Sequence, residues 1–102
     1  MESFGKLVRD NVPQILENQG NKCDVDTLNK DHALEYLYIK LQETIFDLVD
    51  TEDLDELADI LEIVYTIGGK YGYSSEDLIK RMIEKKEEYG SFEKNLLLKK
   101  IY

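Results

Sequence analysis

The spacing of apolar residues predicts two long helices in the middle of the chain. From Asp31 to Val49 they recur at three- and four-residue steps: Leu34, Leu37, Tyr38, Leu41, Ile45 and Leu48. From Glu52 to Lys70 one stripe holds Leu54, Leu57, Ala58, Leu61, Val64 and Tyr65, and a second holds Ile60, Ile63 and Ile67. A helix that is apolar on most sides needs more than one neighbour, and we expect one of them to belong to another subunit.

Shorter helices are predicted on both sides of this pair. Pro13 lies where a first helical turn tolerates proline, which favours a helix over about residues 12–19. Ser74 and Asp77 resemble a capping box, with Asp in place of the usual Glu or Gln, and predict a helix that lasts until about Tyr89.

These elements predict an all-α fold: a single domain over residues 1–102, built as an antiparallel helical bundle. No repeat or linker divides the chain. The link near Asp50 is so short that the two long helices are expected to fold back on each other. A short strand near Leu96, Leu98 and Ile101 is also expected, with residues 5–8 as its natural partner.

Charge and composition narrow the classes of partner. The net charge of −9 argues against binding to a nucleic acid polymer, because such binding requires a basic protein surface. It does not exclude a small phosphorylated ligand, because a bound cation reverses the local sign. No apolar run approaches the ~20 residues of a membrane span, and no signal peptide is evident, so we expect no membrane association. Cys23 is the single cysteine, and a cytoplasmic location is the simplest expectation.

Four carboxylates interrupt the apolar pattern of the two long helices. Glu43 and Asp47 lie on the first helix, and Glu56 and Asp59 lie on the second. If the helices form a hairpin about Asp50, the two pairs meet across the groove, where they repel one another unless neutralised. A hard divalent cation such as Mg²⁺ would neutralise them. The other interpretation is that all four point into solvent, and spacing alone leaves both open.

Three segments resemble one known family. They are `KLVRDNVPQIL` near the N-terminus, `DELADILEIVYTI` in the second long helix, and `YGSFEKNLLL` near the C-terminus. Together, and in this order, they resemble a small single-domain branch of the MazG-like and phosphoribosyl-ATP pyrophosphohydrolase-like superfamily. The members of this superfamily are all-α nucleoside triphosphate pyrophosphohydrolases.

The resemblance implies an activity and an assembly. The chain is expected to hydrolyse a nucleoside triphosphate to a monophosphate and pyrophosphate, with house-cleaning of aberrant nucleotides as a candidate role. Mg²⁺, or Mn²⁺ in its place, is the implied cofactor, and a homodimer or homotetramer is the implied assembly. In the implied reaction Mg²⁺ would neutralise charge on the triphosphate while water attacks the α-phosphorus.

The resemblance also implies roles for particular residues. Asp47, Glu56 and Asp59 correspond to metal ligands, and Glu43 is the candidate to orient or deprotonate the water. The implied phosphate-binding residues are Lys6, Arg9 and Lys94. For Arg9 a second interpretation stays open, in which it pairs with the adjacent Asp10 and anchors the N-terminal helix.

Two positions depart from the family pattern. Thr44 stands where the family has a ligand carboxylate, and Asn95 stands where it often has an arginine. Three interpretations remain: Thr44 binds the metal weakly, Glu43 takes over after a modest helix rotation, or hydrolysis is lost. In the last case the chain is an inactive relative that serves as a nucleotide-binding or regulatory module.

Overall fold

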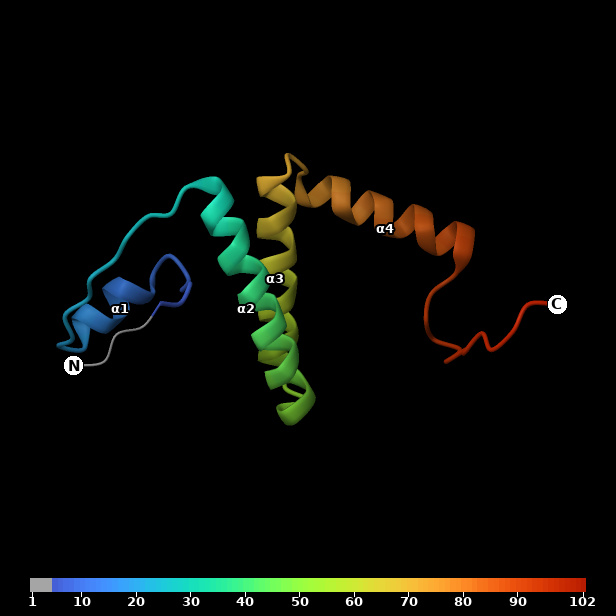
Figure 1. The fold of residues 1–102 in the computed structure, drawn as a ribbon, viewed down its shortest axis with the longest axis horizontal. Helices are drawn as coiled ribbons and strands as arrows, with labels where there is room; N and C mark the ends of the chain where they lie inside the picture. Colours follow the sequence, from blue (N-terminus) through green and yellow to red (C-terminus); the bar gives the residue numbers. More distant parts are fainter. Residues whose placement is uncertain (1–4) are drawn as a thin grey trace.

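The computed structural model describes residues 5–102, and within them the chain is all-helical (Figure 1). The helices are α1 (Val12–Asn18), α2 (Lys30–Thr51), α3 (Leu54–Lys70) and α4 (Ser75–Tyr89). The predicted all-α class is confirmed, and the predicted helices lie close to the observed ones. The expected strand pair is not formed among the described residues, since residues 5–8 and 96–101 contain no strand.

Helices α2 and α3 form an antiparallel hairpin at the centre of the molecule (Figure 1). Glu52 ends α2 in the left-handed conformation, with φ of 53°, and so reverses the chain. The side chain of Asp53 then accepts a 3.1 Å hydrogen bond from the backbone N–H of Asp55 and caps α3. The sequence predicted the second helix to begin at Glu52, and the structure corrects this start to Leu54, because α2 extends through Thr51.

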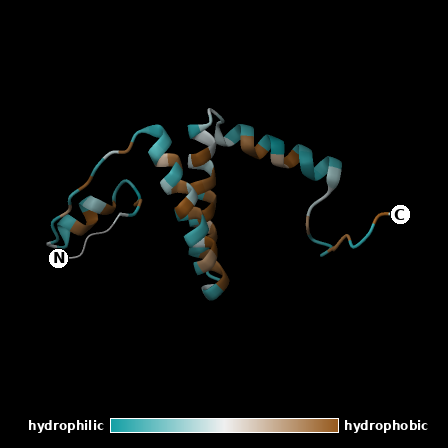
Figure 2. Ribbon diagram, viewed as in Figure 1, coloured by the Kyte–Doolittle hydropathy of each residue, from teal (hydrophilic) through white to brown (hydrophobic). Residues whose placement is uncertain are grey.

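A small core holds the hairpin together. Leu37 of α2 packs with Ile63 and Ile67 of α3, and Leu7, Leu34 and Leu41 pack partly buried around them. The stripe of α3 that faces α2 is therefore the isoleucine stripe. The other stripe, including Leu54, Leu57, Leu61 and Val64, remains exposed. Figure 2 shows that α3 is hydrophobic along most of its length, as expected for a helix that needs a second neighbour.

The α3–α4 corner is fixed by local contacts. The predicted capping box is confirmed: the Asp77 N–H donates to Ser74 Oγ at 3.1 Å, and the Ser74 N–H donates to the Asp77 carboxylate at 2.8 Å. Leu78 packs so closely on Gly68 that a Cβ there would lie 2.8 Å from Leu78 Cδ1. These contacts set the direction in which α4 leaves the hairpin.

The molecule is elongated, with α1 and the segment after α4 on opposite sides of the hairpin (Figure 1). Its extents are 61 × 32 × 23 Å and its radius of gyration is 17.9 Å. A compact chain of this length has a radius of gyration of about 13 Å. Much apolar surface is consequently left uncovered by the chain itself. None of the described helices has the length and apolarity that a membrane span requires.

Leu37→Ala is expected to destabilise the hairpin by about 2–4 kcal/mol, because it removes the most buried side chain of a small core. Urea unfolding followed by circular dichroism measures the change. Val25→Ala, at a side chain that is exposed in the α1–α2 connection, is the control and should leave stability nearly unchanged. Equal effects of the two substitutions would contradict the described core.

Candidate functional site

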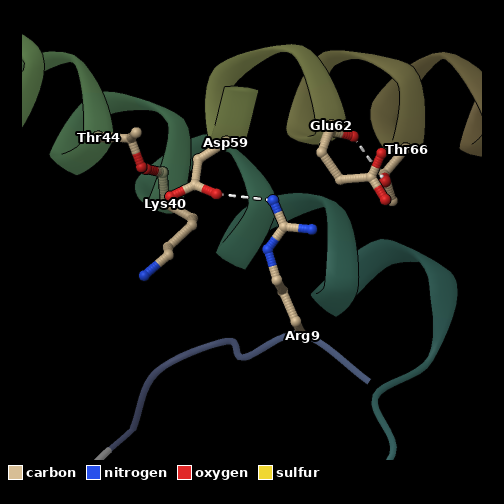
Figure 3. Close-up of polar contacts among 6 residues, drawn as sticks. All are labelled: Arg9, Lys40, Thr44, Asp59, Glu62 and Thr66. Atoms are coloured by element: carbon tan, nitrogen blue, oxygen red, sulfur yellow. Dashed lines mark hydrogen bonds and ion pairs between the residues drawn. The ribbon is translucent and has the colours of Figure 1, made fainter. Parts of the chain in front are cut away.

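The clearest long-range polar contact of the described chain joins two of the sequence motifs. Arg9, which precedes α1, donates to the carboxylate of Asp59 on α3 across 2.6 Å (Figure 3). The bond to Asp59 is the main reason that the pKa of Arg9 is raised. Both side chains are about half exposed, so the pair adds little to stability. Its importance is positional, because it holds the N-terminal segment against the acidic edge of the hairpin.

This contact argues against one of the two interpretations of Arg9 and leaves its phosphate-binding role as a prediction. The local pair with Asp10 is not the one formed, since the guanidinium reaches Asp59 instead. Glu62, one turn further along α3, also contributes to raising the pKa of Arg9. Arg9 therefore lies beside carboxylates of α3. A guanidinium is a group that also binds phosphate, through paired hydrogen bonds.

Among the predicted metal ligands, Glu56 lies close enough to Asp47 and to Asp59 to be affected by their charges. Glu56 is half-buried, and partial burial is the first cause of its raised pKa. The negative charges of Asp47 on α2 and Asp59 on α3 are the next causes, followed by Asp53 and Asp55. Across the hairpin, Asp47 of α2 is thus near enough to Glu56 of α3 for their charges to interact. Their mutual repulsion favours a proton or a cation at this edge.

Glu43 lies apart from these three acids. It lines a small pocket of about 50 Å³ between the N-terminal segment and α2. The other residues of this pocket are Gly5, Lys6, Leu7, Tyr36, Ile39 and Lys40. Glu43 is not among the charges that raise the pKa of Glu56. The predicted set of four therefore divides into Asp47, Glu56 and Asp59 on one side, and Glu43 with two lysines on the other.

The side chains do not form a finished metal centre. Within residues 5–102, no three His, Cys, Asp or Glu side chains are placed to hold one ion in common. The donor chemistry nevertheless fits a hard cation, because Asp47, Glu56 and Asp59 offer carboxylate oxygens in a strongly negative environment. These three are the residues that could hold Mg²⁺ or Mn²⁺, after side-chain movements that draw their oxygens together.

Thr44 has a structural role in this hairpin. Its side chain is 4% exposed, and its hydroxyl donates to the carbonyl oxygen of Lys40 at 2.7 Å (Figure 3). The position where the family resemblance expects a carboxylate is therefore buried. A charge here would be costly without a cation beside it.

Lys94 is not brought to the acids by its own chain. It belongs to the irregular segment that follows α4, where it lines a surface hollow formed by residues 89–96. Figure 1 shows this segment at the far end of α4, on the opposite side of the hairpin from α1. Of the three predicted phosphate-binding residues, Lys6 and Arg9 thus lie near the hairpin and Lys94 does not.

Sequence reasoning overlooked Lys40 and Tyr36 as site residues. Both line the pocket that contains Lys6 and Glu43. A signal was available, because Lys40 and Glu43 are three residues apart and so share one face of α2. That Lys6 lies beside Glu43 could not be predicted from local spacing, because the N-terminal segment must first fold back onto α2.

The comparisons with known proteins add no relative. The chain matches no known protein family, no curated protein and no solved structure. The MazG-like resemblance accordingly rests on the three sequence motifs, and the function it implies is a proposal.

Glu56→Gln is expected to raise the melting temperature of the metal-free protein at neutral pH. The raised pKa of Glu56 means that folding penalises its charged form, and a neutral amide escapes this penalty. The penalty exists above the raised pKa and disappears below the ordinary pKa of glutamate. The advantage of Gln should therefore fade as the pH falls through this interval, as monitored by thermal unfolding.

Glu87→Gln, on the exposed surface of α4, is the matched control and should not change the melting temperature at either pH. A Glu56→Gln protein that is less stable than the wild type at neutral pH would show that the carboxylate is stabilised by its surroundings.

Proposed function

We propose that the chain is a metal-dependent nucleoside triphosphate pyrophosphohydrolase with a MazG-like helical bundle. The observation that supports the proposal is the Arg9–Asp59 contact, because Arg9, which would bind the phosphate, lies at the hairpin edge that also carries Glu56 and Asp47. The negatively charged triphosphate and the acidic edge of the hairpin would repel each other. A divalent cation bound between them would neutralise part of both charges. The exposed stripe of α3 supports assembly as a homodimer or homotetramer.

The proposed roles of the acidic and basic residues follow from their charges. Asp47, Glu56 and Asp59 would hold Mg²⁺, which when bound supplies charge neutralisation at the triphosphate oxygens. Arg9 makes one hydrogen bond to Asp59 at the same edge and would exchange this carboxylate for a phosphate, to which a guanidinium can donate two parallel hydrogen bonds. Lys6 and Lys40 add positive charge beside Glu43.

Glu43 is the candidate to orient and deprotonate the attacking water. It lines a pocket whose volume of about 50 Å³ accommodates roughly one or two water molecules. Lys6 and Lys40 line the same pocket, so the carboxylate that would accept the proton lies beside two basic side chains. Positioning and electrostatics, and not covalent chemistry by the protein, would supply the rate enhancement.

The direct test is a panel of nucleoside triphosphates, each incubated with Mg²⁺ or Mn²⁺ and assayed for pyrophosphate release. At least one is expected to be hydrolysed to its monophosphate. Asp59→Asn should lower that rate by roughly 100-fold or more, because it removes a metal ligand and the partner of Arg9. Glu87→Gln is the control and should keep full activity.

A second candidate function is that of an inactive relative that binds nucleotides and regulates through its assembly. The burial of Thr44 favours this candidate, because the family's first-helix carboxylate is replaced by a hydroxyl that bonds within α2. Metal-dependent nucleotide binding without turnover on any member of the panel would establish it in place of the enzyme.

Thr44→Glu tests whether the buried position still belongs to a metal site. Without metal, an unpaired carboxylate at this site should cost about 3 kcal/mol in the free energy of unfolding. Mn²⁺ should restore much of this loss if the new carboxylate joins Glu56 and Asp59 around the ion. Denaturant unfolding with and without Mn²⁺ measures both effects.

The matched control is Thr44→Gln, which has the same size without the charge. It should be destabilised but should gain no more from Mn²⁺ than the wild type does. Equal recovery of the Glu and Gln proteins would remove position 44 from the proposed site.

A further inference from the structure

The segment after α4 exposes an unusual amount of apolar surface. Within residues 91–102, six large apolar side chains are each at least 77% exposed: Phe92, Leu96, Leu97, Leu98, Ile101 and Tyr102. The hydrogen bonds described for this segment are local, namely Asn95 N–H to the Phe92 carbonyl and Glu93 N–H to Ser91 Oγ. Runs of exposed apolar residues of this kind mark contact surfaces in soluble proteins.

The charge of this segment is opposite to that of the hairpin. Residues 91–102 contain three lysines and one glutamate. Residues 41–62, which form the end of the hairpin, contain nine acidic residues and no Lys or Arg. The two segments are therefore electrostatically complementary, which steers one toward the other and selects against wrong pairings.

The hairpin end also offers apolar surface for such a contact. Phe46 and Val49 of α2 are at least 70% exposed, and so is Leu54 at the start of α3. Leu57 and Leu61 continue the exposed stripe of α3 from there. An acidic surface with apolar side chains among its carboxylates matches a segment in which lysines flank three consecutive leucines.

The segment is directed away from the hairpin of its own chain. Helix α4 spans about 22 Å and carries residues 91–102 outward from the hairpin (Figure 1). Docking onto its own hairpin would require α4 to swing about the corner that the Ser74–Asp77 capping box and the Gly68–Leu78 contact fix. A second copy offers the same surface without any such movement, and a two-fold axis allows both copies to exchange their segments.

The exposed area of the chain is ample for such an exchange. Its accessible surface is 9567 Å², whereas a compact monomer of the same mass exposes about 6,000 Å². The excess is several times the roughly 800 Å² that each partner buries in a standard protein interface. Each copy thus has enough uncovered surface to receive one segment and donate another.

We infer that residues 91–102 form an arm that docks on the acidic, apolar end of the α2–α3 hairpin of a second copy of this chain. Docking there carries Lys94 to the acidic edge that its own chain keeps out of reach. The arm itself is independent of the proposed function. The phosphate-binding role of Lys94 rests on it, and makes the site a composite of two subunits.

The deciding experiment separates contacts between copies from contacts within one chain. A ¹⁵N-labelled chain with Cys23→Ser is mixed with unlabelled chain that carries Cys23→Ser and Ser91→Cys, spin-labelled at the new thiol. The spin label should broaden the amide signals of residues 46–61 in the labelled partner. Broadening that appears only when the spin label and ¹⁵N are in the same chain, or no broadening of these signals, would overturn the inference.

Sedimentation equilibrium provides the second measurement. The double substitution Leu96→Asp and Leu98→Asp should weaken self-association at least tenfold while helix content stays constant, because both leucines are exposed and lie outside the helices. Added salt should weaken the wild-type association as well, since part of the attraction is electrostatic. A wild-type chain that remains monomeric, or a double variant that associates as tightly as the wild type, would overturn the arm.

The experiments test the proposed enzyme activity and the proposed arm independently of each other. Intermolecular broadening in a chain that hydrolyses no nucleoside triphosphate leaves the arm in place and removes the enzyme. Hydrolysis by a chain that shows no intermolecular broadening keeps the enzyme and removes the arm.

Discussion

Repulsion among carboxylates at one end of the α2–α3 hairpin is the constraint on which the other features depend. The packing of Leu37 against Ile63 and Ile67 fixes the two helices side by side, and the tight turn at Glu52 brings their acidic ends together. The pKa of Glu56 is raised first by its partial burial and then by the neighbouring negative charges of Asp47 and Asp59. Arg9 relieves part of it at Asp59, and in doing so holds the N-terminal segment against α3. A divalent cation and a basic arm from a second copy are two further ways to neutralise the same charge.

Local sequence signals predicted most of the fold. Helical periodicity, Pro13 in the first turn of α1 and the Ser74–Asp77 capping box depend on residues within one or two turns of each other, so the sequence contains them directly. The expected strand between the chain ends depends on pairing over almost the whole chain, and the outward course of α4 prevents it (Figure 1). The predicted start of α3 was wrong for a local reason. Several acidic and hydroxyl side chains near the turn could cap the helix. Because Glu52 adopts the left-handed conformation, Asp53 is the residue that does so.

The site was predicted in part. The proximity of Asp47 to Glu56 follows from a hairpin with a short turn, and the charge of Asp47 is, after partial burial, a cause of the raised pKa of Glu56. Glu43 lies one helical turn further from the hairpin end than Asp47, which moves it about 6 Å along α2. That displacement separates it from the acidic edge and places it beside Lys40. The choice of Arg9 between its neighbour Asp10 and the distant Asp59 depends on how the N-terminal segment crosses α3, which no local pattern specifies.

The central claim is that the acids of both hairpin helices bind one divalent cation at the Asp47–Glu56–Asp59 edge. The most direct measurement is a titration of the ¹⁵N-labelled protein with substoichiometric Mn²⁺, read as paramagnetic broadening of backbone amides. The claim predicts that amides near Asp47 and around residues 55–60 broaden first, well before those of the equally acidic segment 84–88 on α4. Simultaneous broadening of both regions would show that the cation binds only as a diffuse counterion and would contradict the claim.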